Sequence, residues 1–209
     1  MTNEQKNTLL IVGLNGSPKK DGNTAVLLHE TLQECSVQGA RTEIINCREA
    51  LQGQKNPFCV NCESPCQAKC AVGKPLEKVF ATLSKADGLV IGSPVYFGTV
   101  SGQLKAFWDK TRSLRSNHSL LNVVGGAVSV GSSQYGGEET TVKTIHSMML
   151  VHGMIVVGDG YIDDDCGHFG ALATKPAAED SKALERARVL GRRIVQVARS
   201  TMDIRAGRK

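Results

Sequence analysis

Short apolar runs alternate with amphipathic stretches along the chain. The spacing of apolar residues predicts helices at 24–37, 74–85, 101–115, 138–152 and 179–200. Runs rich in Val, Ile, Leu and Gly lie between them and predict strands at 9–12, 41–46, 86–92, 121–130 and 154–158. Strands that alternate with helices form a parallel sheet covered on both faces. The pattern therefore predicts an α/β fold.

Five strand–helix units predict a doubly wound sheet with the strand order 2-1-3-4-5. In such sheets ligands bind beyond the carboxyl ends of the strands, near the switch point between strands 1 and 3. Segment 48–73 is too polar and broken for regular structure, so we expect a cysteine-rich insert there, after strand 2. The length is that of one domain, 1–209, which carries this insert.

The loop after the first strand is rich in small residues and leads directly into a helix. Asn23 or Thr24 is the expected N-cap of that helix. Backbone N–H groups and the positive end of a helix meet there, which suits a phosphate. Ser17 and Thr24 add hydroxyl groups, and Lys19 adds a positive charge. The glycine spacing matches neither the nucleotide P-loop nor the G-x-G-x-x-G fingerprint.

Two further loops of unusual composition follow the third and fourth strands. The first, 93–98, contains a Ser-Pro turn, an apolar residue, two aromatic residues and a glycine. The second, 131–137, is rich in Gly and Ser, so its backbone can approach a flat polar ring. A phosphate at one end and a planar heteroaromatic ring at the other describe flavin mononucleotide, FMN.

The residues of these loops resemble the NAD(P)H-dependent FMN reductase branch of the flavodoxin-like superfamily. The likeness runs from about residue 8 to 200 and is carried by 16–24, by 93–98 with 105–110, by 136–140 and by 187–193. It implies a flavodoxin-like fold and dimers or tetramers with flavins near the subunit contacts. It implies that FMN binds to Ser17, Lys19, Gly22, Asn23, Thr24, Pro94, Val95, Tyr96, Phe97, Gly98, Ser129, Val130, Gly131, Ser132, Gly136 and Gly137.

Four of the seven cysteines lie in the predicted insert, at the spacing C-x2-C-x3-C-x3-C. Dense thiolates favour a soft metal, and the expected ligands are Cys59, Cys62, Cys66 and Cys70. A compact loop of this kind favours a [4Fe–4S] cluster, and zinc is the alternative, although structural zinc usually takes two separated pairs. The run resembles that of iron–sulfur flavoproteins, but their usual spacing is C-x2-C-x2-C before a longer gap.

Composition and charge exclude several other classes of protein. The net charge of +5 is mild and dispersed, and no aromatic residues interleave with the basic ones, so we expect no nucleic-acid partner. No apolar run approaches the roughly 18–20 residues that cross a membrane, so we expect no membrane partner. The polar N-terminus lacks the apolar core of a signal peptide, which predicts a cytoplasmic location.

The sequence therefore predicts an oxidoreductase that uses FMN and a [4Fe–4S] cluster. It would move electrons between NAD(P)H or a ferredoxin-like carrier and a small acceptor. Two alternatives remain open: a non-enzymatic electron carrier or redox sensor, and an FMN reductase with zinc in the cysteine loop. The sequence names no catalytic residue, and a homodimer or homotetramer is expected from the resemblance alone.

Overall fold

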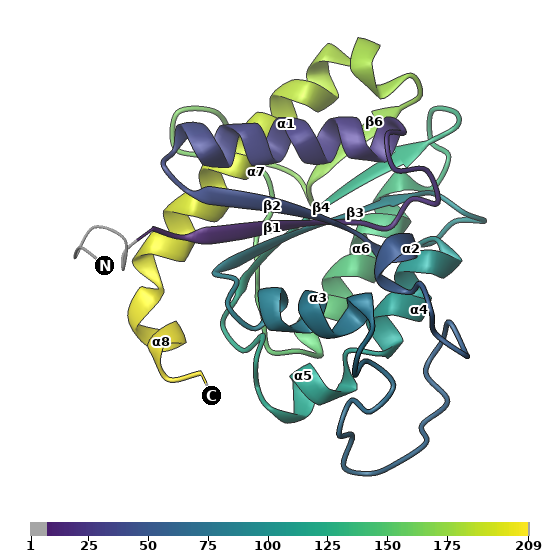
Figure 1. The fold of residues 1–209 in the computed structure, drawn as a ribbon. Coiled ribbons are helices and arrows are strands. Elements are labelled where there is room, and N and C mark those ends of the chain that lie inside the picture. The colour runs from purple at the N-terminus through teal and green to yellow at the C-terminus, as the bar shows by residue number, and fades with distance from the viewer. Residues whose placement is uncertain (1–7, 209) are drawn as a thin grey trace.

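The strands form one parallel sheet between two layers of helices (Figure 1). The computed structural model describes residues 8–208. The strands are β1 Leu10–Asn15, β2 Arg41–Asn46, β3 Gly88–Pro94, β4 Val124–Gly131, β5 Ile155–Val156 and β6 Ala171–Thr174. The helices are α1 Asn23–Val37, α2 Cys47–Ala50, α3 Pro75–Leu83, α4 Gly102–Asp109, α5 Arg112–Ser116, α6 Glu138–Leu150, the 3-10 helix η2 Ala177–Glu179, α7 Ser181–Ser200 and α8 Met202–Ala206.

The strand order is β2-β1-β3-β4-β5, as predicted. The fifth position is divided between two strands, because β5 pairs with the start of β4 at Val124 and β6 pairs with its end from Val128 onward. The chain leaves the sheet between them and returns. The sequence pattern predicts no strand between 158 and 179. It does not reveal β6, because Ala171–Thr174 is short and lacks the β-branched run that marks the other strands.

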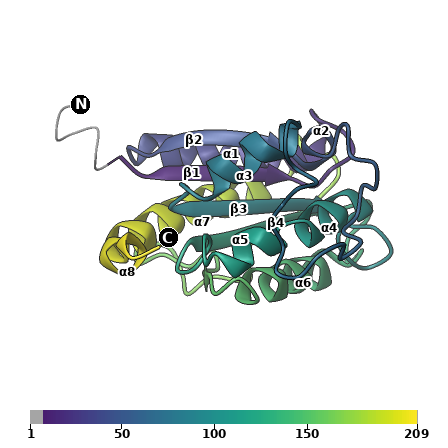
Figure 2. The same cartoon turned by 60° about the horizontal axis from the view of Figure 1, so that its bottom comes forward.

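Each face of the sheet buries its own core, because side chains along a buried strand alternate between the two faces. On β1, Leu10, Val12 and Leu14 face α3, α4 and α6, whereas Ile11 faces α1 and α7. Figure 1 shows α1 and α7 together on one side of the sheet and α3 to α6 on the other, and Figure 2 shows the same layers from a second angle. No helix in the described part of the chain is long and apolar enough to span a bilayer.

The helix predicted at 101–115 is broken into α4 and α5. The Thr111 hydroxyl donates to the carbonyl oxygen of Trp108 at 2.7 Å, and the N–H of Lys110 bonds Phe107 three residues back. A threonine hydroxyl that competes for a backbone carbonyl in this way interrupts the regular i to i−4 ladder. The insert also begins later than predicted, since Cys47–Ala50 is helical.

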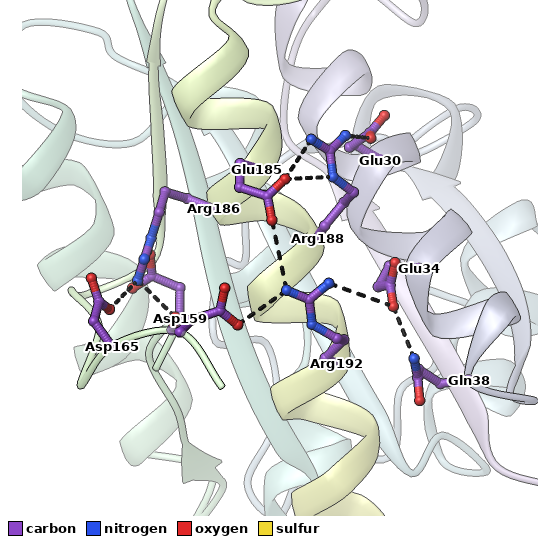
Figure 3. Close-up of polar contacts among 10 residues, drawn as sticks. Glu30, Glu34, Gln38, Asp159, Asp165, Glu185, Arg186, Arg188 and Arg192 are labelled. Atoms are coloured by element: carbon purple, nitrogen blue, oxygen red, sulfur yellow. Dashed lines mark hydrogen bonds and ion pairs between the residues drawn. The ribbon is translucent and has the colours of Figure 1, made fainter. Parts of the chain in front are cut away.

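Helix α7 packs closely against α1 and ties down the segment after β5. Gly191 makes the close approach possible, because a Cβ there would stand 2.6 Å from the carbonyl oxygen of Thr31. Figure 3 shows the polar contacts that surround this packing, in which Arg188 pairs with Glu30 and Arg186 pairs with Asp159. Asp159 is fully buried, and Arg186, Arg188 and Arg192 of α7 are all engaged in ion pairs.

Candidate functional site

Three loops meet at the carboxyl ends of β1, β3 and β4 and line one cavity of about 440 Å³. The predicted site residues that line it are Ser17, Lys19, Gly22, Asn23, Thr24, Pro94, Val95, Tyr96, Val130, Gly131 and Ser132. Pro18, Asp21 and Lys175 also line it, although they are not among the FMN contacts that the resemblance implies. Segments far apart in the chain therefore form a common site where a doubly wound sheet is expected to bind its ligand.

The first loop is held in shape by Asn15, the last residue of β1. Its buried amide donates to the carbonyl oxygen of Lys20 at 3.1 Å and to the Asn46 side chain at 3.0 Å. Its Oδ1 accepts from the N–H of Ser17 at 2.9 Å, and the Ser17 hydroxyl accepts from the N–H of Lys19 at 3.1 Å. These bonds fix the loop before any ligand is bound.

The N-terminus of α1 opens into the cavity without a side-chain cap. The N-cap is Gly22, so the prediction that Asn23 or Thr24 would cap this helix is wrong. Asn23 is the first helical residue, and its side chain accepts from the N–H of Ala177 at 2.9 Å. The earliest N–H groups of a helix have no intrahelical partner, and here no side chain takes them. An uncapped helix start of this kind fits a phosphate.

The loop after β3 forms a tight turn beside the cavity. The backbones of Tyr96 and Thr99 exchange both hydrogen bonds, and Phe97 and Gly98 between them have φ angles of 49° and 80°. Two consecutive positive φ angles define a type I′ turn, which normally takes Asn-Gly or Gly-Gly. Phe97 adopts this unfavourable conformation with its side chain fully exposed, which marks the turn as a strained position at the rim of the site.

Five predicted FMN contacts do not line this cavity: Phe97, Gly98, Ser129, Gly136 and Gly137. Ser129 is fully buried within β4, and its hydroxyl has no hydrogen-bond partner among the described residues. Gly137 lines a neighbouring cavity of about 540 Å³, which lies between the start of α6 and β6. The Thr140 hydroxyl donates to the carbonyl oxygen of Gly98 at 2.8 Å, so the second and third loops contact each other.

The four cysteines of the insert are all free thiols. Glu63 folds the loop back on itself, because it accepts from the N–H of Gln67 at 3.0 Å and pairs with Lys69 at 2.7 Å. The hydrogen bond from Lys69 lowers the pKa of Glu63. Across residues 8–208, however, no three Cys, His, Asp or Glu side chains come together as a metal site. The donor chemistry fits a cluster, but the sulfur atoms have to converge before they can hold one.

Two other cysteines are buried in the hydrophobic core. Burial raises the pKa of the Cys35 thiol to about 12 and raises that of Cys47 as well. Thiols with raised pKa values remain protonated and unreactive at neutral pH. Cys35 and Cys47 are therefore structural residues of the core, and the insert is the part of the described chain with several accessible thiols.

Comparison with known proteins identifies the family. The model of the NADPH-dependent FMN reductase family matches residues 9–168. The chain belongs to this family. An iron-sulfur flavoprotein of Methanocaldococcus jannaschii is 40% identical over 195 residues, which cover 90% of this chain and 97% of that protein. An NAD(P)H dehydrogenase (quinone) of Chromohalobacter salexigens is 43% identical over 81 residues, which cover 39% of this chain and 40% of that protein.

The fold of this FMN reductase family member is flavodoxin-like. The solved structure of a flavodoxin, WrbA-like protein from Agrobacterium tumefaciens matches it with a TM-score of 0.66 at 20% identity, covering 92% of this chain and 98% of that one. The family and its relatives show a flavin oxidoreductase. The cavity at the carboxyl ends of the strands lies where that chemistry is expected.

Other residues that line or support this candidate site were not predicted from the sequence. Asn15 had a usable signal, because it is a polar residue at the end of an otherwise apolar strand. Lys175 had none, since it follows β6, which was itself not predicted. Glu138 was predicted as the start of a helix within the stretch 136–140 that carries the resemblance, but not as a site residue; it is only 8% exposed and lies against Gly131.

Proposed function

We propose that this chain binds FMN in the cavity of about 440 Å³ and passes electrons through it from a reduced donor to a small acceptor. One observation carries the proposal: the same cavity is lined by an uncapped helix start with Lys19 and by the loops of small residues after β3 and β4. The helix start suits a phosphate, and the two loops suit a flat ring. Ser17, Lys19 and the N–H groups at the start of α1 would hold the phosphate.

The residues from Pro94 to Tyr96 and from Val130 to Ser132 would hold the ring of FMN. Bound FMN supplies a centre that takes up two electrons together or one at a time. The protein contributes the position of that centre and the polarity around it. NADPH is the donor that the family name supports, NAD(P)H is the one in the name of the Chromohalobacter relative, and a ferredoxin-like carrier is the alternative. A quinone is a candidate acceptor, as in the name of the Chromohalobacter relative.

FMN binding is tested with a matched pair of lysine variants. Lys19 lines the cavity, whereas Lys20 is exposed and pairs with Glu49 at 3.3 Å. Lys19→Met should weaken FMN binding by about tenfold, the size expected of one charge-assisted contact, while Lys20→Met should change it by less than twofold. Riboflavin, which lacks the phosphate, should bind both variants as it binds the wild type.

Titration of the apoprotein with FMN, followed by flavin fluorescence, measures these constants. If FMN does not bind, or if Lys19→Met weakens riboflavin as much as FMN, the proposed orientation is wrong. Anaerobic mixing with NADPH then separates an enzyme from a carrier. Bleaching of bound FMN supports the reductase, and a flavin that NADPH and NADH leave oxidised supports the electron carrier.

We also propose a [4Fe–4S] cluster on Cys59, Cys62, Cys66 and Cys70. The iron-sulfur flavoprotein name of the Methanocaldococcus relative and the four free thiols support it. Iron, acid-labile sulfide and zinc are measured on protein purified without oxygen. Cys62→Ser should remove iron and sulfide and leave FMN binding intact, and Cys35→Ser should leave both cofactors in place. A preparation that contains zinc without sulfide would replace the cluster by a zinc site.

A homodimer or homotetramer is the assembly we propose. Phe97 and Tyr135 are almost fully exposed aromatic side chains at the rim of the site, and exposed apolar groups of this kind are typical of contact surfaces. Sedimentation equilibrium measures the mass in solution. A monomer at all concentrations would reject this part of the proposal without affecting FMN binding.

A further inference from the structure

Glu138 is a buried carboxylate without a partner. It is the first residue of α6 and only 8% exposed, and its Oε1 is buried with no hydrogen-bond partner among the described residues. The residue also lines the neighbouring cavity of about 540 Å³. Burying such a group without a partner is unfavourable, so its position calls for a reason. The positive end of α6 offsets part of this cost.

The carboxylate lies directly behind the loop that lines the proposed FMN cavity. A Cβ on Gly131 would stand 1.8 Å from Glu138 Oε1, so the carboxylate occupies the space that a side chain at Gly131 would take. A Cβ on Gly136 would stand 3.4 Å from the same oxygen. Gly131 lines the cavity of about 440 Å³. The backbone of this glycine therefore lies between the Glu138 carboxylate and the cavity.

We propose that the Glu138 carboxylate lowers the reduction potential of the flavin bound in this cavity. It acts through its charge, across the loop, without touching the flavin. The inference rests on the proposed binding of FMN. Reduced FMN that has gained two electrons and one proton carries one more negative charge than oxidised FMN. A carboxylate behind the loop disfavours that added charge. The carboxylate also offsets the positive end of α6, which would otherwise stabilise the added negative charge on reduced FMN.

Removing this charge should make bound FMN easier to reduce. Two unit charges about 10 Å apart at an effective dielectric constant of about 20 change an equilibrium by roughly tenfold. Glu138→Gln should therefore raise the affinity for reduced FMN relative to oxidised FMN by about tenfold, which is a potential about 30 mV higher for a two-electron couple. Equilibration with a reference dye in the absence of oxygen measures this potential.

Glu139→Gln is the matched control. It makes the same change of charge at the next residue, but the Glu139 side chain is half exposed and pairs with Lys143 at 2.6 Å. Water screens such a charge, so Glu139→Gln should change the affinity for reduced FMN relative to oxidised FMN by less than twofold. Glu138→Met is a second variant, which removes the charge without leaving a polar group to bury.

The outcomes separate this inference from the proposed function. A rise in potential with Glu138→Gln or Glu138→Met, and none with Glu139→Gln, supports it. An unchanged potential in a Glu138 variant that binds FMN overturns it, while the proposed function stands. Loss of FMN binding by both Glu138 variants, with normal binding by Glu139→Gln, also overturns it, because Glu138 would then hold the loop or the cofactor. Failure of the wild type to bind FMN overturns the proposed function first.

Discussion

Replacing Phe97 by asparagine should stabilise the protein, although it removes a large apolar side chain. Phe97 has a φ of 49° in the turn after β3, and its relative exposure of 105% shows that it buries no apolar surface within its own chain. A left-handed conformation costs an ordinary residue about 1–2 kcal/mol, and asparagine pays much less. Asn-Gly is also the favoured pair for this turn. The expected gain in the free energy of unfolding for Phe97→Asn is therefore about 1 kcal/mol.

Urea denaturation of the apoprotein measures this gain, which should appear as a higher midpoint with an unchanged slope. The melting temperature of a chain of this size should rise by about 2–4 °C. Tyr135→Asn offers a second test, since Tyr135 has φ 59° and is 92% exposed. Phe58→Asn is the control, because Phe58 is exposed without a positive φ and should show no gain. A lower free energy of unfolding for Phe97→Asn would refute the reasoning, and with it the strain assigned to this turn.

The remaining predictions concern the core and the helix layer. Arg186→Gln should lower the free energy of unfolding by about 3–5 kcal/mol, because it leaves the fully buried Asp159 without its arginine. Gly191→Ala should cost about 1–3 kcal/mol, because the new Cβ would meet the Thr31 carbonyl. Burial lowers the pKa of His152 to about 4, from about 6.5 in the unfolded chain. Between pH 6.5 and 4 the unfolded chain binds a proton at His152 that the folded chain does not. The free energy of unfolding should therefore fall by up to about 3 kcal/mol as the pH drops through this range.

Each of these predictions has a control measured by the same denaturation. Arg193→Gln, on the same helix, removes only a contact to the Gln196 side chain and should cost less than about 0.5 kcal/mol. Gly102→Ala should be neutral or stabilising, since nothing lies within 4 Å of a Cβ there. His152→Gln should flatten the stability profile between pH 6.5 and 4. A wild-type profile that is already flat, or an Arg193 variant as unstable as the Arg186 variant, would contradict these assignments.

The sheet was predictable because its strands carry continuous apolar runs, which are typical of strands buried on both faces and not of surface segments. β1 and β3 are buried on both faces, as their apolar sequences LIVGLN and GLVIGSP indicate. β6 was not predictable, because its short ALAT sequence has no such run and its pairing with β4 depends on the return of the chain after residue 157. Local propensity is a weak guide where tertiary pairing decides the structure.

The candidate site was predictable to the extent that it consists of loops that directly follow strands. Ser17, Val95 and Gly131 could be placed at one edge from topology alone, since parallel strands end on the same side. Lys175 and the burial of Glu138 could not, because each depends on how a later element packs over the edge. The cysteines of the insert were recognisable from their spacing, but spacing does not determine whether their sulfur atoms converge.

The division of the fifth sheet position between β5 and β6 has a consequence for the behaviour of the protein in concentrated solution. β5 has two residues, β6 has four, and the chain leaves the sheet between them. This edge therefore has no long row of unpaired backbone N–H and C=O groups. A strand of a neighbouring molecule can therefore form few backbone hydrogen bonds with this edge of the sheet. The interrupted border should protect the protein from fibrous aggregation through that side.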